Sequence, residues 1–592
     1  MICKNCGEQL EENAKFCTKC GARTDMDGAA NANINAGAAN MNVNPSQFSV
    51  NPSQFTAPFP SGEAAVNTHK SKLPVIIAVI LVIAAIAIAG AVAFLALTGN
   101  SSKAGSMSPQ EYFQYVETKS LDESTGTTSS AYKCYYDIMH GNASSSQVIT
   151  LNVEKPLQDL IKSYVGMDMS WLKSISLTCD GYINGGDITA KGNIGLNGVG
   201  VLDYDSAIST ADQAVLFRLP SISDAYLATP LNTATNYDPT AFSKMADMLP
   251  DQQRINNIVK RYGDILVKDI TNVEKTTADM TVGSVTQSCT RLDANINAET
   301  AKKLAQDVAA SIKSDNDLIA IIDSAITASG QKGLSSAEIV NQISKTLENV
   351  ANSSTGSSGT SAIYTIYTNG NDEIVGTEIS VNTGSGSPVP VVKCLAPVSG
   401  GNSALDFEIY MGQYNLSLTG TGNGSDTSHS GKYTLALNYE NLLDIDVENY
   451  NIKDAAKGEI NGSFTLKLAD GAMDLIRNAS SDIASMARLI ESYSLKFDIS
   501  SSGTSSDCKM SLIDNSNSPL LSFDVKTDVN SGTKLNPALP SGSDKVYNAS
   551  DSGQIQQYMS GIRLDSVINA LKQANVPSQY TDMLSSLAAQ LR

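Results

Sequence analysis

Four cysteines near the start of the chain have the types and the spacing of a metal site. Cys3, Cys6, Cys17 and Cys20 form the pattern C-x2-C-x10-C-x2-C. A gap of two residues lets both thiolates of a pair reach one ion from a tight turn, and two such pairs complete the tetrahedral S4 shell that suits Zn2+. The alternatives are disulfides or free thiols. The pattern predicts a zinc ribbon over residues 1–24.

A zinc ion held by four thiolates has no open position for a catalytic water, so the expected Zn2+ is structural. A module this short has almost no hydrophobic core, and metal binding must supply its folding free energy. Such a ribbon either docks a partner, a protein rather than a nucleic acid, or is an inert folded cap.

The other groups with catalytic potential are few. The chain has three histidines, His69, His140 and His429, and their separation argues against a Ser/His/Asp triad or a His-rich metal site. His429 lies in the sequence "GNGSDTSHSGK" and is expected to be solvated in a turn. His140 lies six residues after Cys134, which leaves a Cys/His nucleophile pair as an alternative.

Two Ser-x-x-Lys sequences raise the question of a serine enzyme. They begin at Ser130 and Ser170, with lysines at Lys133 and Lys173, and Ser314-Asp315-Asn316 follows later in the chain. Together they resemble motifs of penicillin-recognising enzymes, but the third motif, Lys-Thr-Gly, is absent. In a serine-rich chain such short matches arise by chance, and we expect no enzyme.

Five further cysteines lie beyond the first hundred residues. Because their number is odd, at most two disulfides form among them, and no two make a C-x2-C pair. Isolated buried thiols are the favoured interpretation over disulfides. These residues are Cys134, Cys179, Cys289, Cys394 and Cys508.

An apolar run follows the cysteine-rich start. Residues 73–97 read "LPVIIAVILVIAAIAIAGAVAFLAL", without a charge. As a helix this run spans about 37 Å, enough to cross a bilayer core of about 30 Å. Because it is too long for a signal-peptide core and about 70 residues precede it, we expect an uncleaved signal anchor in the lipid bilayer. Trp171, close after two methionines, is expected to be a core residue or a membrane-proximal anchor.

The orientation of this segment follows from charge and redox chemistry. Lys70 and Lys72 flank its start, whereas Lys103 alone lies close after its end. The thiolate shell favours a reducing compartment. We therefore predict a single-pass protein of the cell membrane with a cytoplasmic N-terminus and an extracellular C-terminal region. Residues 25–70, which are rich in Asn, Ala, Pro and Ser, are expected to form a disordered tether.

This layout resembles the zinc-ribbon single-pass membrane proteins of Gram-positive bacteria, of which the teicoplanin-resistance-associated membrane protein is an example. The residues that carry the resemblance are the four cysteines, Gly7, Gly21 and the run 73–97. It covers about residues 1–100. The resemblance implies a role in the cell envelope, in sensing or in surface interaction.

The region beyond residue 103 alternates strand and helix patterns. Hairpins are predicted at 174–202, with a turn at Gly185-Gly186, and at 361–381, with a turn at Asn369-Gly370. Later strands alternate apolar and polar residues, which indicates antiparallel sheet with one wet face. These strands are centred on Leu405–Met411, Tyr433–Tyr439, Phe464–Leu468, Leu495–Ile499 and Leu521–Val525.

Helical periodicity separates these strands near 241–268, 297–352, 469–492 and 553–591. Ser335 and Glu338 are predicted to form a capping box. The hexapeptides that begin at Leu219 and Leu539 share five of six residues, which favours two related α+β units, residues 104–355 and 360–592. The predicted fold class is therefore multi-domain: a zinc ribbon, a transmembrane helix and an α+β exterior of antiparallel sheets with packed helices.

The charge of the chain excludes one class of partner. Residues 104–592 carry 34 basic and 54 acidic residues, a formal charge of −20. Phosphate binding needs clustered cations, so no nucleic acid is expected on the exterior region.

The leading hypothesis is a non-enzymatic cell-envelope protein whose exterior region binds an envelope component or a protein partner. The first alternative is an extracytoplasmic carrier or chaperone that holds a lipid or peptide on a curved sheet. The second is a serine-based wall-modifying enzyme, which requires Ser130 or Ser170 within hydrogen-bonding reach of its lysine.

Overall fold

The structure is a computed structural model that describes residues 103–591, apart from 127–129, 185–186, 211, 232–245, 247, 330–334, 354–360, 383–387, 412–413, 456, 480–490 and 533–543. Among these residues no helix is both long and apolar enough to cross a membrane. The predicted ribbon, tether and apolar run at 73–97 lie outside them.

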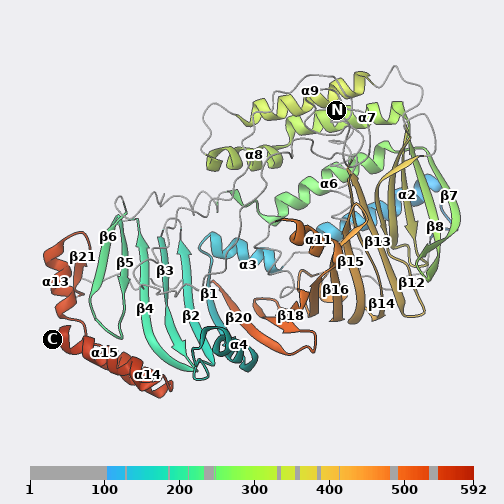
Figure 1. The fold of residues 1–592 in the computed structure, drawn as a ribbon. Helices are drawn as coiled ribbons and strands as arrows, with labels where there is room; N and C mark the ends of the chain where they lie inside the picture. Colours follow the sequence, from blue (N-terminus) through green and yellow to red (C-terminus); the bar gives the residue numbers. More distant parts are fainter. Residues whose placement is uncertain are drawn as a thin grey trace, which may run out of the picture. The chain divides into compact units, whose positions relative to one another are not determined.

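The described strands form one sheet (Figure 1). From edge to edge the order is β21-β6-β5-β4-β3-β2-β1-β20-β19-β18-β17-β16-β15-β14-β13-β11-β10-β9-β8-β7, and β12 also pairs with β13. Neighbours are antiparallel except β6 and β21, which are parallel. The strands are β1 (Ala143–Val153), β2 (Ser174–Asn184), β3 (Asp187–Leu196), β4 (Val199–Ser209), β5 (Ala214–Arg218), β6 (Tyr226–Pro230), β7 (Val273–Val282), β8 (Val285–Ile296), β9 (Ser361–Thr368), β10 (Ile374–Asn382), β11 (Val389–Leu395), β12 (Val398–Ser399), β13 (Asn402–Met411), β14 (Tyr414–Ser425), β15 (Ser428–Leu437), β16 (Glu440–Tyr450), β17 (Gly462–Leu468), β18 (Tyr493–Ser502), β19 (Ser505–Asp514), β20 (Pro519–Ser531) and β21 (Val546–Asn548).

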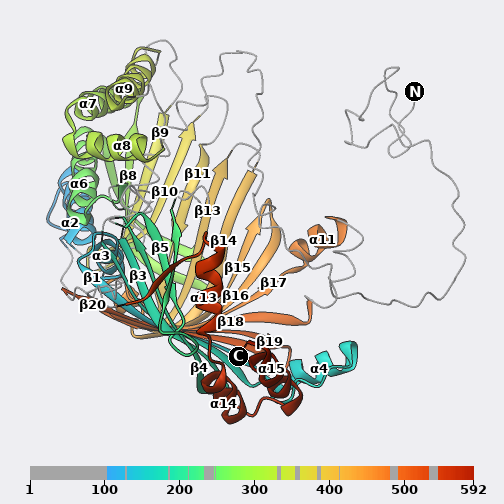
Figure 2. The ribbon, with the colours of Figure 1, turned by 90° about the vertical axis from the view of Figure 1, so that its left-hand side faces the viewer.

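Helices connect and cover parts of this sheet (Figure 2). Helices α2 and α6 pack on each other, α7 packs on α9, α11 lies on β16 and α14 lies on β4. The described helices are α2 (Pro109–Gly126), α3 (Ser130–Met139), α4 (Lys155–Val165), α6 (Gln252–Asp269), α7 (Ala298–Ser314), α8 (Asn316–Ser329), α9 (Ser336–Ser353), α10 (Ile452–Ala455), α11 (Asp470–Ala479), α13 (Ser552–Ser560), α14 (Asp565–Gln573) and α15 (Ser578–Leu591).

Alternation of apolar and polar residues gives the sheet two unlike faces. Phe497 lies opposite Phe464 on one neighbouring strand and opposite Met510 on the other. Met510 in turn lies opposite Phe523, so one face carries a row of large apolar side chains. Because side chains alternate between the two faces of a strand, the residues next to these in sequence form a polar face.

The main core lies where helices cover the β8–β9 part of the apolar face. Tyr112 and Phe113 of α2 pack with Leu292 of β8 and Ile366 of β9, and all four are at most 1% exposed. The Tyr112 hydroxyl donates to the buried Asp372 carboxylate at 2.7 Å. The start of the described chain is thereby fixed to the sheet.

The predicted hairpins and the capping box are confirmed. The pairs β2–β3 and β9–β10 are antiparallel, although Gly185 and Gly186 lie outside the described residues. Ser335 Oγ accepts from the Glu338 N–H at 3.2 Å, and Glu338 accepts from the Ser335 N–H at 3.1 Å. The sheet-rich α+β character of the region is thus as predicted.

The two predicted exterior units contribute to the same sheet. β1 pairs with β20, β8 with β9, and β6 with β21, so strands from before and after the predicted boundary are neighbours three times. The repeated hexapeptides directly precede β6 and β21, and Tyr226 lies opposite Val546. The second hexapeptide lies largely outside the described residues, and the relation of the two units stays a prediction.

Candidate functional site: a polar hollow on the sheet

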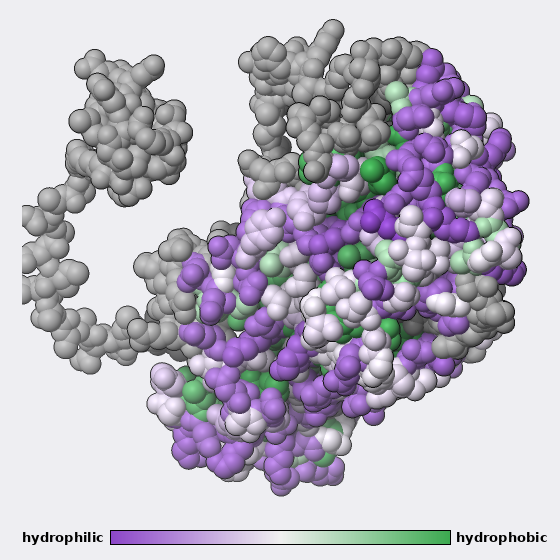
Figure 3. Space-filling model, turned by 90° about the vertical axis from the view of Figure 1, so that its right-hand side faces the viewer, coloured by the Kyte–Doolittle hydropathy of each residue, from purple (hydrophilic) through white to green (hydrophobic). Residues whose placement is uncertain are grey.

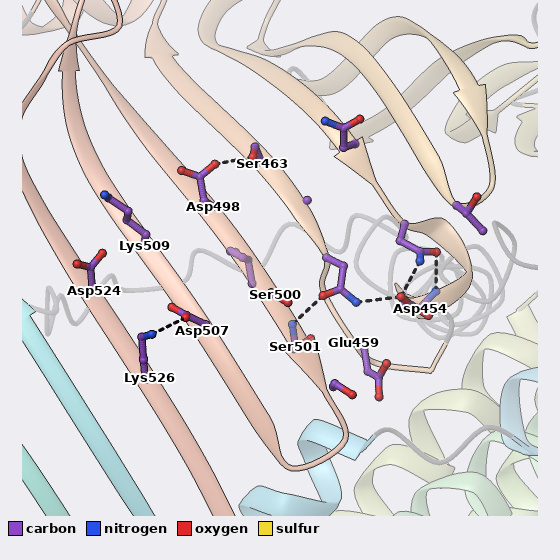
Figure 4. Close-up of a pocket in the computed structure, with 17 residues that line it drawn as sticks. Asp454, Glu459, Ser463, Asp498, Ser500, Ser501, Asp507, Lys509, Asp524 and Lys526 are labelled. Atoms are coloured by element: carbon purple, nitrogen blue, oxygen red, sulfur yellow. Dashed lines mark hydrogen bonds and ion pairs between the residues drawn. The ribbon is translucent and has the colours of Figure 1, made fainter.

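The polar face is hollowed across β16–β20 (Figure 4). The hollow has a volume of about 1020 Å3 and is lined mainly by Asp, Glu, Asn, Ser and Lys side chains. Its position follows from strand register, because Asp498 lies opposite Lys509, and Lys509 lies opposite Asp524. The apolar row described above occupies the opposite face of the same strands.

Hydrogen bonds fix several of these side chains. Ser463 Oγ donates to Asp498 at 2.5 Å, and Asn152 Nδ2 donates to Asp524 at 2.7 Å. Lys526 forms an exposed ion pair with Asp507 at 3.2 Å. In Figure 4 Ser463, Asp498, Asp507, Asp524 and Lys526 lie along neighbouring strands of one face.

A second set of polar groups closes the end of the hollow. Asp454 accepts from Asn451 Nδ2 at 2.6 Å and from Asn461 Nδ2 at 2.9 Å. Glu459 accepts from the Gly503 N–H at 2.7 Å. The lining as a whole contains five carboxylates and two lysines, a formal charge of −3. It offers many donors and acceptors, and none of the described side chains that line it is aromatic, so it is suited to a polar, hydrated ligand.

A row of ionic groups crosses the same face further along the sheet. Glu378 of β10, Lys393 of β11 and Glu408 of β13 lie directly opposite one another. Burial opposes a charge on Lys393, but ion pairs with Asp406 at 2.7 Å and Glu408 at 2.5 Å outweigh it and raise the pKa of Lys393 to about 12. Burial raises the pKa of Glu378. Because Lys393 is occupied by these ion pairs, we interpret the row as stabilising the sheet.

The Ser-x-x-Lys residues have other contacts. Lys133 pairs with Asp137 at 2.5 Å, one turn along α3. Ser170 and Lys173 are both exposed, and the Ser170 N–H donates to Asp168 at 3.0 Å. Asp315, within the Ser-Asp-Asn motif, is buried and accepts from the Leu318 N–H at the start of α8. The observed contacts of these groups are structural.

The prediction of a solvated His429 is wrong. His429 lies in β15 and is 9% exposed, and its Nε2 is 2.8 Å from the Tyr433 hydroxyl. A Cβ on Gly422 would lie 2.5 Å from the His429 ring, so the glycine leaves room for it. Burial lowers the pKa of His429. Gly422, which we interpreted as part of a turn, lies in β14 and leaves space for the His429 ring.

His140 has contacts that differ from those of a catalytic base. Its ring stacks on Tyr136 with the centroids 3.9 Å apart, and its Nδ1 lies 2.9 Å from the Tyr136 carbonyl oxygen. Cys134 contacts the Gly503 carbonyl oxygen at 3.8 Å. The two residues thus have separate partners.

The five cysteines beyond residue 103 are free thiols, as favoured, but only Cys289 is buried and the other four are half-buried. Burial raises the pKa of both Cys289 and Cys394 to about 11. A thiol with so high a pKa is a poor nucleophile at neutral pH. No group of three or more His, Cys, Asp or Glu residues within the described part of the chain is arranged to hold a metal ion.

The four N-terminal cysteines lie outside the described residues, and their role as ligands stays a prediction. Comparison with protein families finds a zinc-ribbon domain at residues 2–24, a range that includes all four. Two pairs of thiolates are a donor set that fits tetrahedral Zn2+. No curated protein and no solved structure matches the chain. The chain therefore begins with a zinc-ribbon domain and continues into a large sheet-rich α+β region.

Proposed function

We propose that this chain is a non-enzymatic cell-envelope protein, anchored in the membrane by residues 73–97. The zinc ribbon is cytoplasmic and carries one structural Zn2+ on Cys3, Cys6, Cys17 and Cys20. The sheet region is extracellular and binds a polar envelope component or a protein through the hollow on β16–β20.

The observation that carries this proposal is the hollow itself. Carboxylates, amides, hydroxyls and two lysines converge there from five strands. Fixed polar groups on a rigid sheet can recognise a ligand, because their orientation is set before binding. The contacts of Lys133 and the exposure of Ser170 support a binding role over serine catalysis.

Labelling of intact cells tests the topology. Tyr439 is 76% exposed in the turn between β15 and β16, so a Tyr439→Cys variant supplies a reactive thiol on the sheet region. A membrane-impermeant thiol reagent should label this variant on whole cells. The four N-terminal cysteines should react only after lysis and removal of zinc by a chelator. Labelling of these four on whole cells would overturn the proposed orientation.

Capture from an envelope extract tests the hollow. The detergent-purified chain should retain a component that a Lys509→Glu variant loses. Lys467→Glu is the matched control, because Lys467 is also exposed on the polar face but lies outside the hollow. Equal retention by both variants would place binding elsewhere on the chain.

The apolar face favours a second candidate, an extracytoplasmic carrier. Ile175, Leu177 and Ile194 lie on neighbouring strands of that face and are 37–40% exposed. Large apolar side chains left partly in water on adjacent strands provide a surface for a lipid or peptide chain.

Mass spectrometry of the intact purified chain distinguishes the two candidates. A carrier should copurify with lipid or peptide, and Leu177→Asp should remove that cargo whereas Lys509→Glu should not. If the wild-type chain copurified with no lipid or peptide, the carrier candidate would fail and the polar hollow would remain the proposed binding site.

A further inference from the structure

Helix α4 is an amphipathic helix that buries none of its residues. Leu157, Leu160, Ile161 and Tyr164 follow the i, i+3, i+4, i+7 spacing of one helix face. In a soluble domain such a face packs against the core, but Tyr164 is 84% exposed and Val165 is 66% exposed. Leu157, Leu160 and Ile161 are half-buried, so the apolar face of α4 lacks cover at its C-terminal end.

A second group of exposed apolar side chains lies on α15. Met583 and Leu587 of α15 are 65% and 46% exposed, and Met167 after α4 is 48% exposed. The Trp171 and Tyr580 rings, with centroids 6.0 Å apart, join the two elements. In Figure 2 α4 is drawn next to α15, and in Figure 1 the end of α14 is the part of these two helices nearest to α4.

The segment around Trp171, between α4 and β2, is also tied to α14. Asn197 Nδ2 donates to the Trp171 carbonyl at 2.8 Å and to the Ala574 carbonyl, at the end of α14, at 2.7 Å. We name Tyr164, Val165, Met167, Met583 and Leu587 the α4–α15 patch. The contacts hold its two halves in a fixed relation.

We propose that the α4–α15 patch lies on the surface of the bilayer in which the chain is anchored. This inference rests on the proposed membrane anchor. The predicted membrane helix ends at Leu97, six residues before Lys103, and six residues reach about 20 Å at most. The Lys103 N–H donates to the buried Asp372 carboxylate at 2.8 Å, so the chain is fixed to the sheet directly after that short connection. The sheet region is thereby tethered to the lipid at its β9–β10 end, which raises the effective concentration of the bilayer for the rest of the region.

The side chains of the patch suit a lipid surface. Tyr and Trp favour the membrane–water interface, and a helix with one apolar face and lysines on its polar side lies in the interface plane. Lys155 and Lys162 are 79% and 62% exposed and pair with Asp159 and Asp168. Because these lysines are balanced by carboxylates, apolar insertion drives the contact, and it should occur on zwitterionic lipid and depend little on salt.

Trp171 makes the contact measurable, because it is the single tryptophan of the chain. The full chain is placed in phosphatidylcholine nanodiscs with brominated or ordinary acyl chains, and its tryptophan emission is compared. We expect brominated lipid to reduce the emission about twofold, since the residues next to Trp171 insert into the interface. The double variant Tyr164→Asp/Val165→Asp should lose this quenching.

Tyr439→Asp is the matched control, an equally accessible tyrosine on a turn away from the patch, and it should be quenched like the wild type. Circular dichroism checks that each variant is folded, and Met583→Asp replaces the double variant if that one unfolds. A chain that enters nanodiscs but is not quenched overturns the patch proposal alone. A chain that self-associates through the patch instead overturns it too. A chain that never enters nanodiscs overturns the proposed anchor.

Discussion

Two segments of the sheet share the same alternation of residues but differ in what covers their apolar face. In the covered segment, β7–β11, Leu292 and Ile366 are fully buried beneath α2 and its neighbours. In the open segment, β1–β3 with β18–β20, Leu177 and Ile194 are 37% and 40% exposed. Burial therefore depends on which helices return to the sheet, and the covered segment should supply most of the stability.

The difference also separates stability from binding. Half-buried ion pairs occupy the polar face of the covered segment, whereas strands β18–β20 of the open segment line the polar hollow and β20 contacts α4. On the face drawn in Figure 3, hydrophobic residues lie in small groups among hydrophilic ones. The binding functions are thus proposed where the sheet is least covered.

The largest effect should come from removing the same side chain from each segment. Leu292→Ala leaves a cavity beneath α2 and should lower the free energy of unfolding by about 3–4 kcal/mol. Leu177→Ala removes a side chain that is already 37% exposed and should cost about 1 kcal/mol. Urea unfolding followed by circular dichroism measures both. Equal losses would show that the apolar face is covered alike in both segments.

Ion pairs give the next largest contrast. Lys393→Met strips Asp406 and Glu408 of their partner in a site where the lysine is 21% exposed, and should cost about 2–4 kcal/mol. Lys526→Met breaks a pair whose lysine is 62% exposed and should cost less than about 0.5 kcal/mol. Urea unfolding measures both variants. If Lys393→Met left the free energy of unfolding unchanged, the carboxylates of the row would have to be solvated.

Local patterns were sufficient to predict part of the strands and the turn between β9 and β10. Period-two alternation located strands such as Phe464–Leu468, and Asn369-Gly370 marked the turn between β9 and β10. The capping box was predictable because its two side chains are three residues apart. These features depend on contacts between near neighbours in the sequence.

Long-range pairing was beyond such patterns. Nothing in the sequence of β1 indicates β20 as its partner, more than 360 residues away, because alternation fixes which face a residue takes but not its neighbouring strand. The polar hollow was missed for a different reason. Asp498, Lys509 and Asp524 lie on consecutive strands and meet through the register of two hairpins, which alternation alone does not fix. Gly422 indicated that a bulky side chain could lie against its strand, but we interpreted this glycine as part of a turn.

Glu117 tests the covered segment through pH. It lies on α2 and accepts from the Tyr364 hydroxyl at 2.6 Å, and burial raises its pKa to about 7 although that hydrogen bond opposes the rise. Between pH 4.5 and 7 the folded state therefore holds a proton that the unfolded state has released, so this contribution to stability falls as pH rises through that range.

A Glu117→Gln variant removes this titration. It should match the wild type near pH 4.5 and exceed it by about 3 kcal/mol at pH 7.5. Glu111→Gln, at an exposed position of the same helix, should give no such gain. Unfolding in urea at several pH values measures both variants, and a flat difference across pH would contradict a buried carboxyl.

His429 should give the smallest effect, with the opposite sign. Burial lowers the pKa of His429 in the folded state. The unfolded state therefore binds a proton near pH 6.5 that the folded state does not bind, and stability is lost as pH falls below that value. In a Glu117→Gln background, His429→Gln should reduce the remaining loss between pH 7.5 and 5.5 by less than about 1 kcal/mol. If stability instead rose on acidification, His429 would be gaining a partner as a cation, and the ring over Gly422 would have to face water.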